Sequence, residues 1–257
     1  MRRIAIAGLV GGALAAAPAY GASTPPATTA PAPTPPAQPQ YVELSNETTT
    51  TRWAYTNLTL KVRSKPAANA RKVAKLHFNT EDGPPEVYIA LQEFTNGSNV
   101  DWVQVRIPGR PNGRKGWVPR EGLGEFHTLH TQLIIDRRTL RATLFKNGKK
   151  IFKAPVGVGK GSTPTPGGHF WIREKLLSLR SNPAYGPLAF GTAAYSTKLT
   201  DWPGGGVVGV HGTNEPNLVP GRPSHGCVRM HNRDIVKLAK LLKTSDSKGW
   251  GTPVWIK

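Results

Sequence analysis

Cysteine is almost absent from this chain: among its 257 residues, only Cys227 carries a thiol. A single cysteine cannot form an intrachain disulfide, so the fold is not held together by internal cross-links. In an oxidising compartment such a thiol is buried, paired with another molecule, or kept for chemistry. The chain also lacks the paired Cys-x-x-Cys motif that is typical of structural zinc sites.

Long apolar runs are absent as well, and no segment reaches the roughly 20 residues that a transmembrane helix needs. The longest run, Ile4 to Ala17, follows Met1-Arg2-Arg3 and precedes small residues around Ala19-Tyr20-Gly21. This order predicts a secretory signal peptide over residues 1–21. We therefore expect an exported protein of the cell envelope, in the periplasm or cell wall, with no transmembrane helix in the mature chain. The alternative is a signal segment that is retained as an anchor.

Acidic residues are scarce, since 15 Asp and Glu face 34 Lys and Arg, which gives a formal net charge of +19. Nucleic acid is the usual partner of so basic a chain, but export separates the protein from nucleic acid. Anionic polymers of the cell wall are the partner that the charge favours. The other interpretation is that the charge serves only solubility.

The composition divides the remaining chain into three parts. Residues 22–53 begin with a Pro-, Ala- and Thr-rich stretch that is typical of a semi-extended linker. Residues 54–125 alternate short apolar runs with turns, which predicts a small β-barrel. Its expected strands are 58–62, 73–76, 87–91, 102–107 and 116–118.

Residues 126–257 form the second predicted domain, and its local patterns are mostly those of strands. Asn147-Gly148 separates two alternating segments, which is a strong hairpin signal. An apolar stripe at helical spacing predicts one helix, over 232–242. The expected strands are 132–136, 141–146, 150–153, 154–158 and 169–173, and the prolines at 164 and 166 predict a loop over 163–168. The predicted fold class is mainly β, with one clear late helix.

A nucleophilic site is indicated where Cys227 follows His211 within a short stretch. A thiol attacks a carbonyl as the thiolate, so it needs a lowered pKa or an adjacent base. His211 ends an apolar run and is the natural base, while Gly212 lets the backbone turn away. Cys227 is expected on a loop whose amides point at a developing oxyanion. Arg229 is placed either to bind a carboxylate or to hold the loop.

Two family resemblances follow from these residues. The segments Leu60 to Pro66, Trp102 to Val105 and Arg114 to Val118 resemble a bacterial SH3-like domain, which implies binding to cell-wall peptides. Trp102 and Trp117 could line a groove there or pack in the barrel core. The stretch Ser224-His225-Gly226-Cys227-Val228-Arg229-Met230, with His211-Gly212-Thr213-Asn214 upstream, resembles the catalytic domain of L,D-transpeptidases, the YkuD family. This second resemblance covers roughly residues 126–257.

The YkuD resemblance implies a reaction and a set of residues. Cys227 is the nucleophile and His211 is the proton donor and acceptor. The implied substrate is a peptidoglycan tetrapeptide stem: Cys227 forms a thioester, D-alanine leaves, and an amine of a neighbouring stem takes the acyl group to make a 3→3 cross-link. No metal and no cofactor is implied. The expected substrate-binding or oxyanion residues are Ser224, His225, Gly226, Arg229, Gly212 and Thr213.

Other interpretations remain open at this stage. Water in place of the amine would make the protein an L,D-carboxypeptidase or endopeptidase, and an inert second domain would make it a non-catalytic wall-binding protein. A zinc site could draw on His211, His225, Cys227 and His231, although the complete motif argues against it. Papain-like peptidases place the cysteine well before the histidine, and this order is reversed here.

The residues that precede His211 allow one more hypothesis. Tyr195, Trp202 and Gly204 to Gly206 either form a flap over the substrate or make a glycine-rich turn with packing aromatics. The histidines without motif context are predicted to be surface or packing residues: His77, His127, His130 and His169.

Overall fold

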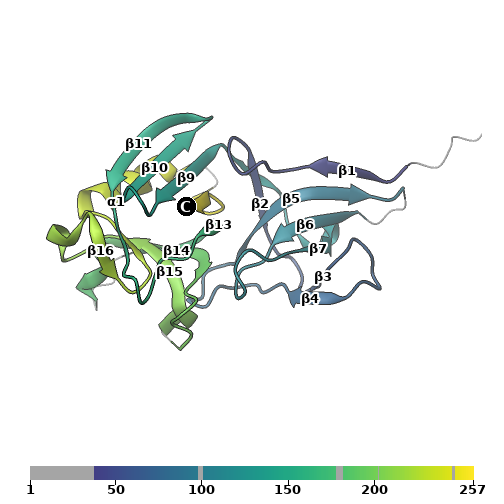
Figure 1. Ribbon diagram of the computed structural model, residues 1–257. Helices are drawn as coiled ribbons and strands as arrows, with labels where there is room; N and C mark the ends of the chain where they lie inside the picture. The colour runs from purple at the N-terminus through teal and green to yellow at the C-terminus, as the bar shows by residue number, and fades with distance from the viewer. Residues whose placement is uncertain (1–37, 98–100, 178–181, 202, 245–246) are drawn as a thin grey trace, which may run out of the picture. The chain divides into compact units, whose positions relative to one another are not determined.

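The computed structural model describes residues 38–97, 101–177, 182–201, 203–244 and 247–257. Residues Ala37–Lys257 form one compact unit. Its described parts contain two sheets and one α-helix, so the prediction of a mainly β fold with one late helix is confirmed (Figure 1). The predicted signal peptide over 1–21, and the linker as far as residue 37, lie outside the described residues.

The first sheet has eight strands, and all its pairs are antiparallel. The strand order is β4-β3-β7-β6-β5-β2-β8, and β1 also pairs with β5. A 3₁₀ turn, Arg120–Gly122, follows β7. The strands are β1 (Gln40–Glu43), β2 (Thr51–Tyr55), β3 (Lys61–Arg63), β4 (Lys72–Lys75), β5 (Val87–Thr95), β6 (Trp102–Arg106), β7 (Lys115–Pro119) and β8 (His127–Leu129).

This sheet differs from the sequence prediction at both ends. Strands β1 and β2 occupy residues 40–43 and 51–55, where a linker as far as 53 was expected. The apolar residues of β2 are Trp53, Ala54 and Tyr55, next to a threonine run, and Trp53 and Ala54 are fully buried. At the other end, β8 pairs with β2, although residues 126–129 were assigned to the second domain.

The second sheet has ten strands in the order β11-β10-β9-β18-β13-β14-β15-β17-β12-β16. The predicted hairpin is present, and Asn147 and Gly148 both adopt the positive φ that a tight two-residue turn requires. The sheet is mixed, because three of its strand pairs are parallel. The strands are β9 (Thr131–Asp136), β10 (Arg141–Lys146), β11 (Lys149–Pro155), β12 (Gly157–Gly159), β13 (Gly168–Leu177), β14 (Leu188–Tyr195), β15 (Val207–His211), β16 (Gly221–Ser224), β17 (Val228–Arg229) and β18 (Pro253–Ile256).

The predicted helix is confirmed as α1 (Asn232–Leu242). Its apolar stripe is buried: Ile235, Leu238, Ala239 and Leu242. The helix packs against β14 and β15. Three 3₁₀ turns complete the described elements of this half: Pro183–Tyr185, Pro203–Gly206 and Pro216–Leu218. No helix in the described residues is long and apolar enough to cross a membrane.

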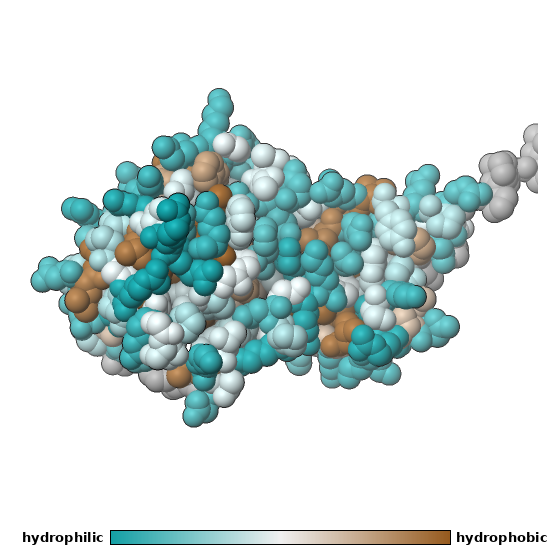
Figure 2. All heavy atoms as spheres, in the orientation of Figure 1, coloured by the Kyte–Doolittle hydropathy of each residue, from teal (hydrophilic) through white to brown (hydrophobic). Residues whose placement is uncertain are grey.

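Strand β5 is buried on both faces, which joins the two sheets into one structure. Successive side chains of a strand point to opposite faces. Val87, Ile89 and Leu91 accordingly lie in the large core shared with the second sheet. Tyr88 and Ala90 lie in the separate core of the first sheet. The face of the molecule that Figure 2 shows is mostly hydrophilic, with scattered apolar residues. The reason is that most of the large apolar side chains are buried in these two cores.

Trp102 and Trp117 are each only 5% exposed, so they are packing residues and do not line an open groove. Trp117 instead packs edge-on against the rings of Tyr41 and Phe94. The SH3-like assignment of residues 54–125 stays a prediction.

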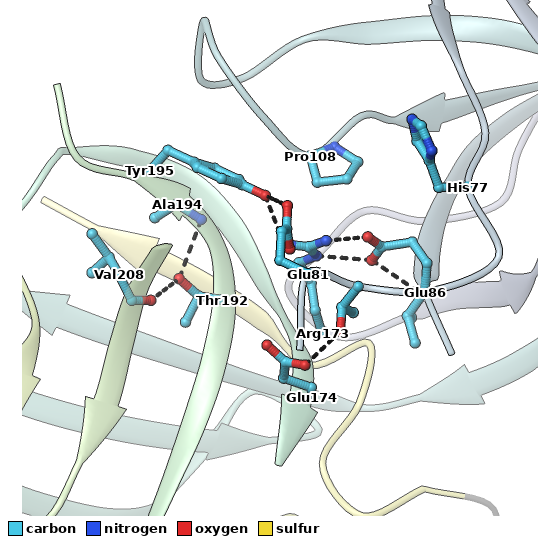
Figure 3. Close-up of polar contacts among 12 residues, drawn as sticks. His77, Glu81, Glu86, Pro108, Arg173, Glu174, Thr192, Ala194, Tyr195 and Val208 are labelled. Atoms are coloured by element: carbon cyan, nitrogen blue, oxygen red, sulfur yellow. Dashed lines mark hydrogen bonds and ion pairs between the residues drawn. The ribbon is translucent and has the colours of Figure 1, made fainter. Parts of the chain in front are cut away.

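A buried ion cluster also joins the two sheets (Figure 3). Arg173 of β13 donates to both carboxylate oxygens of Glu86, and both side chains are only 2% exposed. The same guanidinium contacts Glu81 at 2.9 Å and the Tyr195 hydroxyl at 2.9 Å. Trp171 of β13 adds a hydrogen bond from its indole Nε1 to the Val87 carbonyl, at 2.7 Å. Removing one member of such a buried cluster leaves an uncompensated charge.

We predict that Glu86→Ala destabilises the protein by about 3–5 kcal/mol, because it leaves the Arg173 guanidinium buried with one partly exposed carboxylate. Urea unfolding measures this change. The matched control is Arg233→Ala, whose exposed ion pair with Asp234 spans 3.8 Å and should contribute about 0–1 kcal/mol. Equal effects of the two substitutions would contradict the role assigned to the cluster.

Candidate active site

The parallel pairing of β15 with β17 brings the predicted nucleophile next to the predicted base. In this register Val210 faces Val228, and His211 faces Arg229. Cys227 comes directly before β17 and therefore lies beside Gly209. The Gly209 amide donates a hydrogen bond to the Cys227 sulfur at 3.3 Å. The segment between the histidine and the cysteine is thus the connection between two adjacent parallel strands, and it contains the 3₁₀ turn Pro216–Leu218 and β16.

Gly209 leaves open the space that both functional side chains face. A Cβ on Gly209 would lie 3.8 Å from Cδ2 of His211 and 3.9 Å from Sγ of Cys227. Cδ2 is bonded to Nε2, so this edge of the imidazole is turned to the same side of Gly209 as the sulfur. No hydrogen bond directly joins these two described side chains. Catalytic hydrogen bonds are often long before substrate binds and tighten in the complex.

The environment of His211 fixes which of its nitrogens carries the proton. Nδ1 lies 2.6 Å from the Gly212 carbonyl oxygen. Because a carbonyl only accepts, Nδ1 carries hydrogen, and Nε2 of the neutral ring is free to accept a proton. The side chain is 4% exposed, and the Tyr185 ring packs on it with centroids 4.7 Å apart. Burial lowers the pKa of His211 to about 4, against the opposing effect of the Gly212 hydrogen bond, and the Arg229 charge lowers it further.

Cys227 is half-buried and has a raised pKa. Burial disfavours the thiolate more than the Gly209 amide and the Arg229 charge favour it. At neutral pH the pair therefore rests as a neutral thiol and a neutral imidazole. The thiol therefore needs a base to take its proton for the sulfur to attack.

Two of the predicted motif residues hold the cysteine loop in shape. The Ser224 hydroxyl donates to the Cys227 carbonyl at 2.6 Å and accepts the Gly226 amide at 3.1 Å. Thr165 donates to the Gly226 carbonyl at 2.7 Å and accepts the Gly159 amide at 2.8 Å. Gly226 has a φ of 129°, which glycine adopts readily. The Gly226 amide is therefore already engaged, so an oxyanion would need another donor.

Arg229 has both a structural contact and an unused donor. Its Nη1 pairs with Glu215 at 2.5 Å. Its Nε is buried and has no hydrogen-bond partner. The Glu215 pair supports the loop-holding interpretation, and the free Nε supports a role toward a substrate carboxylate or carbonyl.

The remaining predicted site residues differ in how they are placed relative to Cys227 and His211. His225 is exposed, and its Nε2 lies 3.2 Å from the Lys160 ammonium. Gly212 acts through its carbonyl, which orients His211. The Thr213 amide donates to Asn232 at 2.8 Å, and Thr213 lines a second, separate hollow together with His231.

A cavity of about 370 Å³ opens above Cys227 and His211. Most of its lining residues were not predicted, and Tyr185, Asp82 and Glu174 are among them. Tyr185 lies in the 3₁₀ turn Pro183–Tyr185, and the sequence around it matches no recognised motif. Asp82 belongs to the first sheet, so no local pattern could connect it with the cysteine. Predicted residues among its lining are His211, Ser224, His225, Cys227 and Arg229.

Glu174 is a buried carboxyl group in the wall of this cavity. Its side chain accepts a hydrogen bond from Thr80 of the first sheet at 2.6 Å (Figure 3). Burial raises the pKa of Glu174 well above its ordinary value, and the neighbouring Asp82 carboxylate raises it further. The carboxyl group of Glu174 thus retains its proton to a higher pH than an exposed glutamate does.

The flap hypothesis is only partly supported by the structure. Gly206 lines the cavity. Tyr195 is 5% exposed, and its hydroxyl donates to Glu81, so it is a packing residue and part of no flap. Trp202 lies outside the described residues.

The described residues contain no group of three or more His, Cys, Asp or Glu side chains that is placed to hold a metal ion. His127 stacks on Trp53, and His169 stacks on Trp255. His130 Nδ1 lies 2.8 Å from the Thr49 carbonyl.

Comparison with known proteins gives a consistent result for this half of the chain. The family model of the L,D-transpeptidase catalytic domain, YkuD, matches residues 130–256. The chain is 35% identical over 123 residues to YkuD of Bacillus subtilis strain 168, which covers 47% of this chain and 66% of that protein. It is 36% identical over 108 residues to YkuD of Bacillus licheniformis, covering 42% and 56%. Both relatives are named as L,D-transpeptidases, and the match spans less than two thirds of each.

The solved structure of Bdellovibrio bacteriovorus Bd1075 is 26% identical, with a TM-score of 0.38 and coverage of 50% of this chain and 47% of that chain.

We predict that the rate of Cys227 alkylation by iodoacetamide rises steadily with pH and continues to rise beyond about 8.5, the ordinary cysteine pKa. The reason is that burial raises the thiol pKa and keeps the neighbouring imidazole neutral. The His211→Asn variant should give the same profile. A plateau of reactivity below pH 7 that disappears in His211→Asn would instead reveal a resting thiolate–imidazolium pair.

Proposed function

Because residues 130–256 are a catalytic domain of the YkuD family of L,D-transpeptidases, we propose that the protein is an exported transpeptidase. In this proposal Cys227 is the nucleophile, and the product is a 3→3 cross-link in peptidoglycan. The observation that carries the proposal is the common space beside Gly209, which His211 Cδ2 and Cys227 Sγ both border in the wall of one cavity. Its place of action is the cell envelope.

In the first step the acyl donor is a tetrapeptide stem. Sγ of Cys227 attacks the carbonyl carbon of the amide between the L-centre of the third residue and the terminal D-alanine. As the S–C bond forms, Nε2 of His211 accepts the thiol proton, while the Gly212 carbonyl holds Nδ1–H. The C–N bond then breaks, and the imidazolium returns its proton to the amine of the departing D-alanine. A thioester remains.

The low pKa of His211 makes the imidazole a weak base toward the thiol but makes the imidazolium a strong acid toward the leaving amine. The imidazolium therefore passes its proton rapidly to the leaving amine. The Gly212 carbonyl partly offsets the cost of the transient positive charge. The free Nε of Arg229 is a proposed contact for a substrate oxygen, and His225 is proposed as a second substrate contact in the cavity lining. Ser224 and Gly226 are proposed to act by shaping the cysteine loop, and Gly212 by orienting His211. Thr213 lines the separate hollow and is proposed to act only through its place beside Gly212.

In the second step an amine of a neighbouring stem attacks the thioester carbonyl. The N–C bond forms and the S–C bond breaks. The amine proton passes through His211 to the sulfur, which restores the starting thiol. Residues 54–125 are proposed to form the SH3-like domain and, with the basic surface, to contact the wall.

The central test uses disaccharide tetrapeptide and mass spectrometry. We expect the wild-type protein to release D-alanine and to form the cross-linked dimer. Cys227→Ala should abolish both, and His211→Asn should slow both by about 10²–10⁴-fold through loss of the base. Release of D-alanine without dimer would assign the site to a carboxypeptidase. Undiminished turnover by Cys227→Ala would refute the proposed mechanism.

The pH profile of D-alanine release tests the assignment of His211. We expect activity to hold as pH falls below 6 and to be lost only as it approaches about 4, because protonated imidazole cannot accept the thiol proton. Circular dichroism at each pH is the control for unfolding. A half-maximal point near the ordinary histidine pKa of about 6.5 would contradict the buried neutral imidazole.

A further inference from the structure

The cavity wall is built from both sheets. The first sheet contributes Asp82 directly. The connection between β14 and β15 contributes Ser196, Leu199 and Gly206. This connection leads directly to β15, which carries Gly209 and His211.

Two residues of the first sheet hold that connection in place. Arg110 Nε donates to the Ser196 carbonyl at 3.0 Å, and its Nη2 donates to the Leu199 carbonyl at 3.0 Å. Asn112 forms a reciprocal pair with the Tyr195 backbone: Nδ2 donates to the carbonyl at 2.8 Å, and Oδ1 accepts the amide at 3.0 Å. The Arg110 guanidinium also lies over the Tyr195 ring, 5.2 Å from its centroid.

Both contact residues are half-buried, and their partners are backbone groups. Hydrogen bonds from a charged guanidinium in such a position are stronger than those between neutral groups. The Ser196 side chain orders the same segment by accepting the Lys198 and Leu199 amides. The position of this wall is therefore set jointly by its own turn and by the first sheet.

The loop that carries Arg110 and Asn112 is itself fixed. The Ile107 amide donates to the Arg114 carbonyl at 3.0 Å, and the Arg114 side chain donates to the Pro108 carbonyl at 3.0 Å. Strand β5 anchors the first sheet in the core shared with the second. A fixed loop on an anchored sheet can define the position of the wall that it contacts.

We propose that Arg110 and Asn112 are positioning residues for the transpeptidase reaction, which hold the segment 195–199 as one wall of the Cys227 cavity and so set how tightly the acyl donor binds. This inference rests on the proposed function for its kinetic test. It also assigns the first sheet a role inside the catalytic site, in addition to any contact with the wall.

The test compares the full-length wild type with Arg110→Ala, Arg110→Lys and Asn112→Ala. We expect KM for the tetrapeptide donor to rise about tenfold in the two alanine variants, with kcat changed less than about twofold. The KM of Arg110→Lys should lie between that of the alanine variants and that of the wild type. The reason is that a lysine ammonium replaces a guanidinium whose two nitrogens donate to two different carbonyls. The matched control is Arg63→Ala, whose guanidinium donates to the Ala70 carbonyl within the first sheet; its KM should stay unchanged.

A second measurement does not depend on turnover. Cys227 is alkylated with iodoacetamide and with a bulky fluorescein iodoacetamide. A loosened wall should raise the relative rate of the bulky reagent severalfold in Arg110→Ala and Asn112→Ala but not in Arg63→Ala. Thermal unfolding is followed in parallel to show that each variant is folded.

The outcomes separate the two proposals. An inactive wild type combined with the expected change in reagent selectivity would contradict the proposed function and retain the positioning role. A fall in kcat and in melting temperature, with KM and reagent selectivity unchanged, would reduce both residues to a general structural role and overturn the inference. Unchanged values throughout would overturn it as well.

Discussion

The geometry of the candidate active site depends on the parallel pairing of two short strands, β15 and β17. Their register sets Cys227 beside Gly209 and holds His211 two residues further along the same strand. A shift by one residue would turn the side chains of one strand to the opposite face, and the thiol and the imidazole would no longer share a space. The hydrogen bonds of Ser224 and Thr165 around the cysteine loop protect this register.

Burial is the second determinant, and it acts on both partners in the same direction. It disfavours the charged form of each, so the thiol keeps its proton and the imidazole stays neutral. Such a pair is less reactive at rest than a thiolate–imidazolium pair. It is also less exposed to oxidation, because oxidants attack the thiolate. In the proposed mechanism, this low resting reactivity protects the Cys227 thiol until a substrate carbonyl is in place.

The sequence predicts those parts of the structure whose determinants are local. The Asn147-Gly148 hairpin and the α1 stripe depend on neighbouring residues, and both are present. The proximity of Cys227 and His211 was inferred from a motif and arises from the parallel pairing of β15 with β17, which are connected through β16. Strand β2 was missed because its apolar residues, Trp53 to Tyr55, form a run too short for a clear periodic signal beside several threonines, although Trp53 is among the largest fully buried side chains.

Residues that contact the site from far away in the sequence could not be predicted. Thr80 and Asp82 lie in the connection between β4 and β5, and Thr80 is 94 residues away in the chain from Glu174, its hydrogen-bond partner. No local pattern connects positions so far apart. Arg173 gave no signal either, since an arginine between apolar residues usually suggests an exposed position. Its carboxylate partners lie far away in the chain, in the segment that precedes β5.

Because β5 is buried on both faces, the first half of the chain is part of the core of the second half. A module that only targeted the wall could be joined by a flexible linker and removed without exposing apolar surface. Here Val87, Ile89 and Leu91 lie in the same core as the catalytic sheet, and Arg173 needs Glu86 for its buried charge. Removing residues 54–125 would therefore expose that core and leave a guanidinium without its main partner. Strand β5 therefore supports both halves of the chain, with Tyr88 and Ala90 facing one core and Val87, Ile89 and Leu91 facing the other.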